Sequence, residues 1–132
     1  GAKMYTLIDT DILIDAGRGD DSALGTLQYL EKITILAISI VTKMELTVGC
    51  RNKTEQRELD KFLRHFEIIP LTEASSQLAL KLLQAYRLSH GLLIPDSLIA
   101  ATAMDLEVPL ISKNQCDYRF IEKLDLLVYP LN

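Results

Sequence analysis

Short runs of consecutive apolar residues constrain the fold of this chain more than any other feature of its sequence. Met4–Ile8, Thr34–Ile38 and Pro109–Ser112 are such runs, and none of them alternates apolar with polar residues. A strand with one solvated face alternates, whereas a strand buried on both faces is apolar throughout. The runs therefore predict an α/β fold, in which helices cover both faces of a parallel sheet.

The segments between these runs have apolar residues at helical spacing, and a strand is also predicted at Glu67–Pro70 and at Leu126–Tyr129. Lys113–Phe120 is expected to be a polar loop. The first predicted helix follows Asp9-Thr10, has Ile12, Leu13 and Ala16 at helical spacing, and is broken by Gly17–Asp21. The other predicted helices are Ser22–Leu30 with Ser22 as its cap, Ser39–Gly49, a helix that opens at Thr54, Thr72–Gly91 and Pro95–Leu106.

The length and composition indicate one globular domain over residues 1–132. Of the 132 residues 48% are apolar, which excludes a disordered chain. No internal repeat or Pro/Gly-rich linker divides the sequence. No apolar run approaches the roughly 18 residues that a membrane span requires, so we expect no membrane association.

Cysteine usage and net charge narrow the possible functions. Cys50 and Cys116 form no CxxC pair and no Cys/His cluster, which argues against a zinc site and is typical of a reducing, cytoplasmic setting. The net charge of −4 argues against a general electrostatic binder of nucleic acids. It does not exclude an enzyme whose acids are gathered in one metal site.

Several acidic residues follow predicted strands directly. Asp9 ends the first run, and Asn114 and Asp117 lie in the loop after Pro109–Ser112. The carboxyl ends of parallel strands meet at one edge of a sheet, where ligands of α/β proteins bind. Each residue also has a simpler interpretation: Asp9 as a helix cap, and Asn114 and Asp117 as turn residues.

Three more acids belong to predicted helices. Glu45 borders the apolar side of its helix, where a carboxylate needs a partner, although a solvated position beside Lys43 is an alternative. Asp96 begins a helix rich in small residues and is either a cap or a site residue. Asp11 is more simply explained as a first-turn acid favoured by the helix dipole.

Carboxylates gathered at one point repel each other and raise each other's pKa unless a cation is present. Oxygen donors of this kind suit Mg²⁺ or Mn²⁺. The sequence contains no Gly-rich phosphate loop, no Ser-His-Asp order and no cysteine nucleophile, and His65 and His90 stand isolated. A metal site is therefore the chemistry that the acids favour.

Four segments carry a resemblance to a known family. They are Leu7–Asp11, Thr42–Leu46 with Gly49, Pro95–Ala103 and Ser112–Tyr118. Through them the chain resembles the PIN-domain ribonucleases, and especially the VapC-type toxins of toxin–antitoxin pairs, over nearly its whole length. The resemblance implies a three-layer α/β/α fold with a central, mainly parallel sheet of about five strands.

The resemblance also implies metal-dependent hydrolysis of RNA to products with a 5′-phosphate and a 3′-hydroxyl. Asn114 stands where some members carry an Asp, which places the fourth acid at Asp117. The implied catalytic residues are Asp9, Glu45, Asp96 and Asp117. The implied metal ligands are Asp9, Asp96 and Asp117, bound to Mg²⁺ or Mn²⁺, with Thr10, Ser112 and Asn114 in supporting roles.

Members of the family usually form homodimers and are inhibited by a small VapB-like antitoxin. The helices over Ser39–Gly49 and Thr72–Gly91 carry more apolar residues than one buried stripe needs, which favours a dimer. An antitoxin Arg or Lys is expected to enter the acidic pocket. Its apolar part is expected to pack near four leucines: Leu13, Leu24, Leu27 and Leu30.

Two other functions remain open from the sequence. A haloacid-dehalogenase-like phosphotransferase also begins with a strand and an Asp pair, here Asp9 and Asp11, but it requires Thr or Val where this chain has Leu13. The other function is a non-catalytic PIN-like binding module, which would not need four acids placed at the ligand-binding edge of the sheet.

A basic stripe on one predicted helix has two interpretations, a face for RNA or a solvated surface partly offset by neighbouring acids. The stripe consists of Arg57, Lys61 and Arg64.

Overall fold

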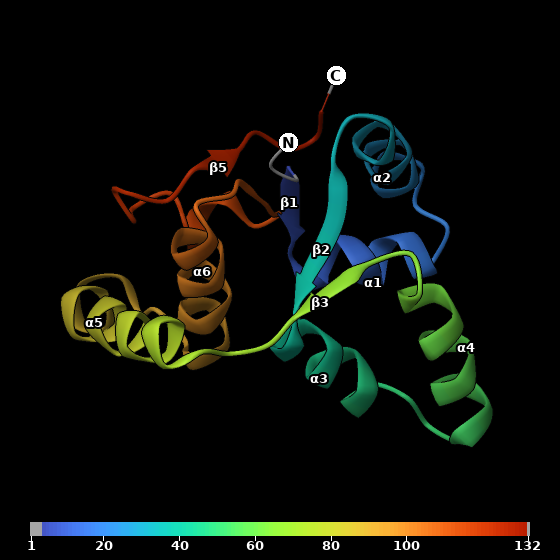
Figure 1. Ribbon diagram of the computed structural model, residues 1–132, viewed down its shortest axis with the longest axis horizontal. Helices are drawn as coiled ribbons and strands as arrows, with labels where there is room; N and C mark the ends of the chain where they lie inside the picture. Colours follow the sequence, from blue (N-terminus) through green and yellow to red (C-terminus); the bar gives the residue numbers. More distant parts are fainter. Residues whose placement is uncertain (1–3, 132) are drawn as a thin grey trace.

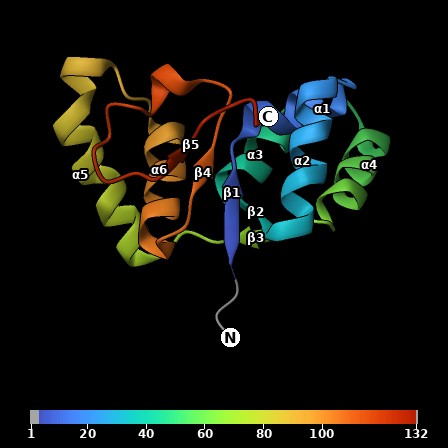
Figure 2. The ribbon, with the colours of Figure 1, turned by 90° about the horizontal axis from the view of Figure 1, so that it is seen from above.

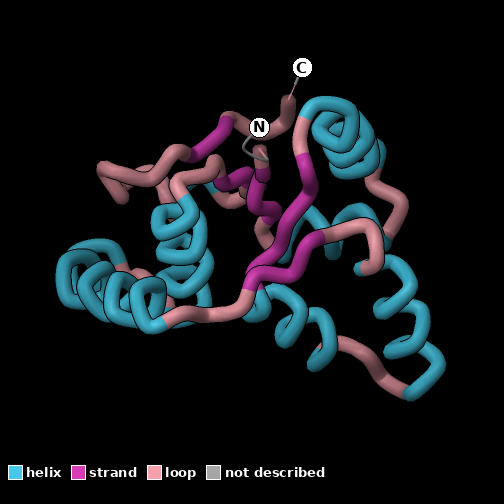
Figure 3. The backbone as a smooth tube through the Cα atoms, viewed as in Figure 1, coloured by secondary structure: helices cyan, strands magenta, loops and turns pink. Residues whose placement is uncertain are grey.

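A computed structural model describes residues 4–131 of the chain. Its centre is a sheet of five strands in the order β3-β2-β1-β4-β5, and every neighbouring pair is parallel (Figures 1 and 3). The expected α/β class and parallel sheet are thereby confirmed. The strands are β1 Tyr5–Ile8, β2 Ile35–Ser39, β3 Glu67–Ile69, β4 Leu110–Ile111 and β5 Leu126–Leu127.

Helices cover both faces of this sheet. Helices α5 and α6 lie on one side of β1, whereas α1, α2 and α4 lie on the other, and α3 contacts both α1 and α6 (Figure 2). No helix within residues 4–131 is long and apolar enough to cross a membrane. The helices are α1 Thr10–Gly17, α2 Asp21–Ile33, α3 Ile40–Val48, α4 Lys53–Leu63, α5 Glu73–His90 and α6 Ile94–Leu106, and a 3₁₀ turn spans Gln115–Asp117.

The two layers enclose two hydrophobic cores. Successive side chains of β1 point to opposite faces, so Leu7 packs in the core under α5 and α6 while Ile8 packs in the core under α1 and α2. Leu110 and Ile111 of β4 divide between the same two cores. Both faces of the central strands are therefore dry, which explains why their sequence is apolar without alternation.

Two helices begin earlier than the sequence predicted. Asp20, not Ser22, caps α2, because its carboxylate accepts a hydrogen bond of 3.0 Å from the backbone N–H of Ala23. Asn52 caps α4, which therefore begins before Thr54. Both true caps carry a side-chain oxygen that satisfies an otherwise unpaired N–H of the first turn.

The junction between α5 and α6 sets the position of Asp96. Gly91 ends α5 in the left-handed conformation, with φ of 73°. Helix α6 starts three residues later, with Pro95 in its first turn. Ala100, Ala101 and Ala103 are completely buried, so α6 packs closely on the sheet and holds Asp96 at the sheet's carboxyl edge.

Candidate active site

Asp9 links the two central strands at their carboxyl ends. It follows β1, caps α1, and accepts a 2.9 Å hydrogen bond from the backbone N–H of Thr10. Its second oxygen, Oδ2, accepts a 2.7 Å hydrogen bond from the hydroxyl of Ser112, which follows β4. Because β1 and β4 are neighbours in the sheet, residues 103 positions apart in the chain meet here. Only 6% of the Asp9 surface is exposed.

Asp11 belongs to the same group. Its Oδ2 lies 3.2 Å from the Ser112 hydroxyl and accepts a 3.0 Å hydrogen bond from the backbone N–H of Asn114. Its Oδ1 is buried and has no hydrogen-bond partner among residues 4–131. Its interpretation as a first-turn acid alone was therefore incomplete, since the carboxylate faces the β4 loop.

Glu45 joins the group from α3. Thr10 Oγ1 donates a 2.7 Å hydrogen bond to Glu45 Oε1 and lies 2.9 Å from Thr42 Oγ1. A hydroxyl has one proton to donate, so Thr42 completes the network by donating to Thr10. Glu45 is exposed, yet its carboxylate is held against the first turn of α1.

Tyr118 is the residue of this site that the sequence analysis did not identify. Its side chain is completely buried, and its hydroxyl donates a 3.2 Å hydrogen bond to Oδ1 of Asp96. The available signal was an aromatic residue directly after Asp117, because a buried tyrosine hydroxyl needs a polar partner. Burial, together with nearby Asp9 and Asp96, raises the pKa of Tyr118, which stays a neutral donor.

Asp117 and Asn114 lie on the exposed loop that follows β4. The Asp117 side chain makes no hydrogen bond to the described residues, although its charge helps to raise the pKa of Asp96. The backbone N–H of Asn114 donates to Asp11, while the Asn114 side chain makes no hydrogen bond within residues 4–131. Asn114 is therefore a polar helper through its backbone.

The pKa shifts show that these acids share one electrostatic environment. Burial raises the pKa of Asp9 to about 7, and the charges of Asp11 and Asp96 add to that increase. Burial also raises the pKa of Asp96 to about 6, with contributions from Asp117, Glu45 and Asp11 that the hydrogen bond from Tyr118 opposes. Burial raises the pKa of Asp11 as well. Acids from four separate segments thus disfavour each other's ionised form.

The donor set fits a hard divalent cation in its chemistry. Within residues 4–131, no three His, Cys, Asp or Glu side chains already converge as a metal-binding group. The carboxylates of Asp9, Glu45 and Asp96 are bound by hydroxyl groups instead. The unpartnered oxygen of Asp11 and the raised pKa of Asp9 are the features that a cation would relieve.

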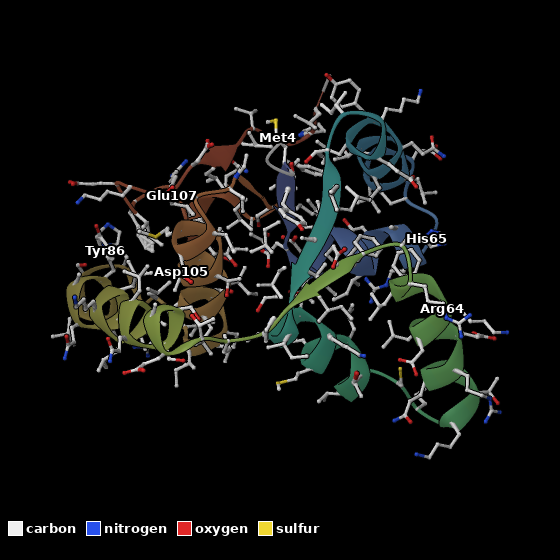
Figure 4. The ribbon with its side chains drawn as sticks, in the orientation of Figure 1. Met4, Arg64, His65, Tyr86, Asp105 and Glu107 are labelled. Atoms are coloured by element: carbon white, nitrogen blue, oxygen red, sulfur yellow. The ribbon has the colours of Figure 1, made fainter. Side chains whose placement is uncertain are left out.

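A cavity of about 280 Å³ adjoins Glu45 between α1, α3 and α4. Lys113, in the loop after β4, pairs with Asp15 at 2.9 Å. Figure 4 shows Arg64 and His65 on the side of the molecule opposite Tyr86. The cavity is lined by Ile14, Arg18, Glu45, Leu46, Gly49, Cys50 and Glu55.

The fold and the site define a parallel α/β domain with acidic residues at the carboxyl ends of its central strands, where proteins of this class bind their ligands. The PIN domain matches residues 6–123, most of the chain. The chain therefore belongs to the PIN-domain family, and the resemblance noted in the sequence is confirmed.

Similar proteins agree with this assignment. The chain is 36% identical over 119 residues to ribonuclease VapC10 of Mycobacterium tuberculosis, covering 89% of each chain. It is 29% identical over 127 residues to ribonuclease VapC1 of Methanocaldococcus jannaschii, covering 93% of this chain and 85% of that protein.

Solved structures with this fold include toxin–antitoxin complexes. VapBC2 of Rickettsia felis, bound to a promoter DNA fragment, superposes with a TM-score of 0.80 at 29% identity, covering 94% of this chain and 98% of that chain. A toxin–antitoxin complex from Klebsiella pneumoniae has a TM-score of 0.77 at 30% identity, with 96% and 98% covered. The expected three-layer PIN-like fold is thereby confirmed.

Proposed function

We propose that this chain is a metal-dependent ribonuclease, a VapC-like toxin that hydrolyses phosphodiester bonds of RNA. The carrying observation is geometric: the Ser112 hydroxyl, at the end of β4, lies 2.7 Å from Oδ2 of Asp9 and 3.2 Å from Oδ2 of Asp11. The raised pKa values of Asp9 and Asp96, about 7 and about 6, agree with this grouping of acids. Relatives that match most of the chain are ribonucleases by name. Membership of the PIN-domain family sets aside the haloacid-dehalogenase-like alternative.

In this proposal Asp9, Asp96 and Asp117 hold the cation, either Mg²⁺ or Mn²⁺. When bound there, the ion supplies positive charge that offsets the carboxylates and the scissile phosphate and favours ionisation of an attacking water. The buried, unpartnered oxygen of Asp11 supports a further role for this residue in the same site. Glu45 is exposed to solvent and is suited to orient water.

The supporting residues fix the acids in place. Ser112 holds the carboxylate of Asp9 through a 2.7 Å hydrogen bond, and Thr10 holds that of Glu45 through another of 2.7 Å. Tyr118 restrains Asp96 and moves no proton, because its raised pKa keeps it neutral. The hydroxyl groups thus set the orientation of carboxylates that repel each other.

The same proposal includes a VapB-like antitoxin as inhibitor. The VapBC2 complex of Rickettsia felis supports such a partner. Of the four leucines expected to contact it, Leu13, Leu27 and Leu30 are only 2%, 7% and 3% exposed and belong to the core. Leu24 is exposed and lines a groove of about 180 Å³ between α2 and α4 with Phe62 and Phe66, which is a better surface for an apolar antitoxin segment.

A homodimer is also part of the proposal. Met44 and Val48 of α3 and Leu80 and Leu88 of α5 are exposed apolar side chains, as the surplus of apolar residues on these helices predicted. Exposed apolar groups mark interaction surfaces when they are contiguous, and Met44 and Val48 lie one turn apart on α3. The cytoplasmic location inferred from cysteine usage stays a prediction.

Cleavage of single-stranded RNA with mapped product ends tests the proposal. We expect activity in Mg²⁺ or Mn²⁺, none in EDTA, and 5′-phosphate and 3′-hydroxyl ends. Asp96→Asn should reduce the rate by more than about 100-fold, because it removes a charged ligand of the site. Asp60→Asn, at an exposed acid of α4, is the matched control and should keep full activity.

The outcomes separate the remaining functions. Cleavage that persists in EDTA would contradict the metal site. If no RNA is cleaved with either cation while the chain still binds the antitoxin, the non-catalytic binding module is the correct function.

A further inference from the structure

Three aromatic rings pack together at the carboxyl end of α5. His90 lies on Phe120 with ring centroids 4.3 Å apart and planes at 37°, and Tyr86 packs edge-on against Phe120 at 5.2 Å. Figure 4 shows Tyr86 between α5 and the connection that leads to β5. We call Tyr86, His90 and Phe120 the aromatic cluster.

The rings differ in their exposure to solvent. Tyr86 and Phe120 are half-buried and rest on the core under α5 and α6, whereas His90 is exposed. The Ser89 hydroxyl lies 2.7 Å from Nδ1 of His90 and fixes the ring's orientation. Phe120 covers one face of the His90 ring, so the cluster presents an ordered aromatic surface to solvent rather than an additional piece of core.

Two short stretches of chain connect the aromatic cluster to the acidic site. Phe120 lies two residues after Tyr118, at most about 7.6 Å of backbone, and Tyr118 donates its hydrogen bond to Asp96. His90 is the last residue of α5, and Asp96 lies in the first turn of the next helix. In Figure 2 the end of α5, the start of α6 and the loop after β4 lie at the same end of the molecule.

Positive charge accompanies the rings. Arg119 precedes Phe120, is exposed, and forms no ion pair or side-chain hydrogen bond within the described part of the chain. Arg87 is held beside the cluster by hydrogen bonds to the carbonyl oxygens of Gly91 and Leu92. An acidic site that binds RNA needs cations at its border, and this border supplies them.

We propose that the aromatic cluster is a nucleobase-stacking subsite, in which an unpaired base next to the scissile phosphate stacks on His90 while Arg119 contacts the RNA backbone. Proteins that bind single-stranded RNA stack its bases on aromatic side chains, histidine included. The subsite selects unpaired substrate, because a base inside a duplex has no free face. This inference rests on the proposed ribonuclease function and specifies how its substrate is held.

A short single-stranded RNA that contains the mapped cleavage site provides the test. Binding is measured in an Asp9→Asn background, which prevents cleavage. Stacking is worth about 1–3 kcal/mol per base, so His90→Ala should weaken RNA binding by about 5- to 150-fold. His90→Tyr should retain binding within about twofold, while His90→Lys, which keeps only charge, should bind as weakly as His90→Ala. His65→Ala, at the other exposed histidine, is the matched control and should bind normally.

An abasic scan of the RNA locates the stacked base. Removing that base should weaken RNA binding to the Asp9→Asn protein as much as His90→Ala does. When the abasic RNA is tested with the His90→Ala variant, binding should be no weaker than with either change alone. In the cleaving protein, His90→Ala should raise KM and leave kcat nearly unchanged.

Two results would overturn the subsite while leaving the ribonuclease intact. One is a KM that is unchanged in His90→Ala. The other is RNA binding by His90→Lys as strong as with histidine, which would show that His90 acts only through charge. A His90→Ala defect seen only with antitoxin would assign the surface to that partner instead. If the unaltered chain cleaves no RNA, the proposed function fails, and the subsite fails with it.

Discussion

Asp9 has two roles that conflict energetically. As the cap of α1 it satisfies a backbone N–H, and as a buried acid beside Asp11 it is costly to ionise. Its pKa of about 7 lies above that of the unfolded chain, so the unfolded state loses this proton first as the pH rises. The free energy of unfolding therefore decreases between about pH 4 and pH 7 and stays lower above that range.

Asp9→Asn should remove this penalty while keeping the cap oxygen. Without metal, the free energy of unfolding of the variant should exceed that of the unaltered chain by on the order of 1–4 kcal/mol at pH 8. At pH 4 the two values should be nearly equal. Urea denaturation in EDTA at both pH values measures the difference. Asp60→Asn should show no such pH-dependent gain, and an Asp9→Asn gain that is the same at both pH values would contradict the argument.

Tyr118 controls the acidity of Asp96. Its hydroxyl stabilises the ionised carboxylate, so Tyr118→Phe should raise the pKa of Asp96 above about 6. Carbon-13 NMR titration of the metal-free protein reports this pKa directly. Tyr29→Phe, at an exposed tyrosine, should leave it unchanged. An unchanged or lowered Asp96 pKa in Tyr118→Phe would show that the 3.2 Å contact does not act on the carboxylate.

Helix ends, rather than helix interiors, position the chemistry of this molecule. Asp9 follows β1 and caps α1, and α6 begins just before Asp96. The turn from α5 to α6 depends on Gly91, whose φ of 73° is unfavourable for any residue with a Cβ atom.

Gly91→Ala should lower the free energy of unfolding by about 1–2 kcal/mol. A Cβ at Gly91 meets no atom within 4 Å, so backbone strain is the only cost. Gly25 provides the matched control, since it lies inside α2 and also has open space. Gly25→Ala should raise the free energy by about 0.5–1 kcal/mol. Chemical denaturation of both variants measures the two changes in the free energy of unfolding. Changes in the same direction would contradict the conformational explanation.

At the scale of the whole molecule, exposed apolar side chains predict self-association. Leu88 is 100% exposed on α5 and Val48 is 85% exposed on α3. We expect a homodimer at micromolar concentration, measured by light scattering, and a shift toward monomer in Leu88→Glu. Ile33→Glu, at an exposed residue of α2, should leave the dimer intact. A monomeric unaltered chain would contradict the prediction.

The strand order also explains how distant residues form one site. Strands β1 and β4 are adjacent and parallel, so the loops after them open at the same edge. Asp9 and Ser112 meet there across the pair, and α6 brings Asp96 to the same end from the neighbouring layer.

The sequence by itself determined the elements and the class of fold. Apolar runs predicted the strands because burial on both faces removes alternation, and Thr72 and Gly91 marked the ends of α5 because caps act within one turn. The placement of Asp9 after a strand was predictable for the same local reason. The caps of α2 and α4 were missed, because Asp20 and Asn52 each lie two residues before the predicted Ser22 and Thr54.

The tertiary structure alone decided which side chains touch. The hydrogen bond from Tyr118 to Asp96 and the contact of Ser112 with Asp11 join residues 22 and 101 positions apart. The meeting of His90 with Phe120 is of the same kind. Local propensity contains no information on such pairs, because their separation is set by strand order and helix packing. The pKa values of the acids depend on these contacts and on burial, and so they too are properties of the folded molecule.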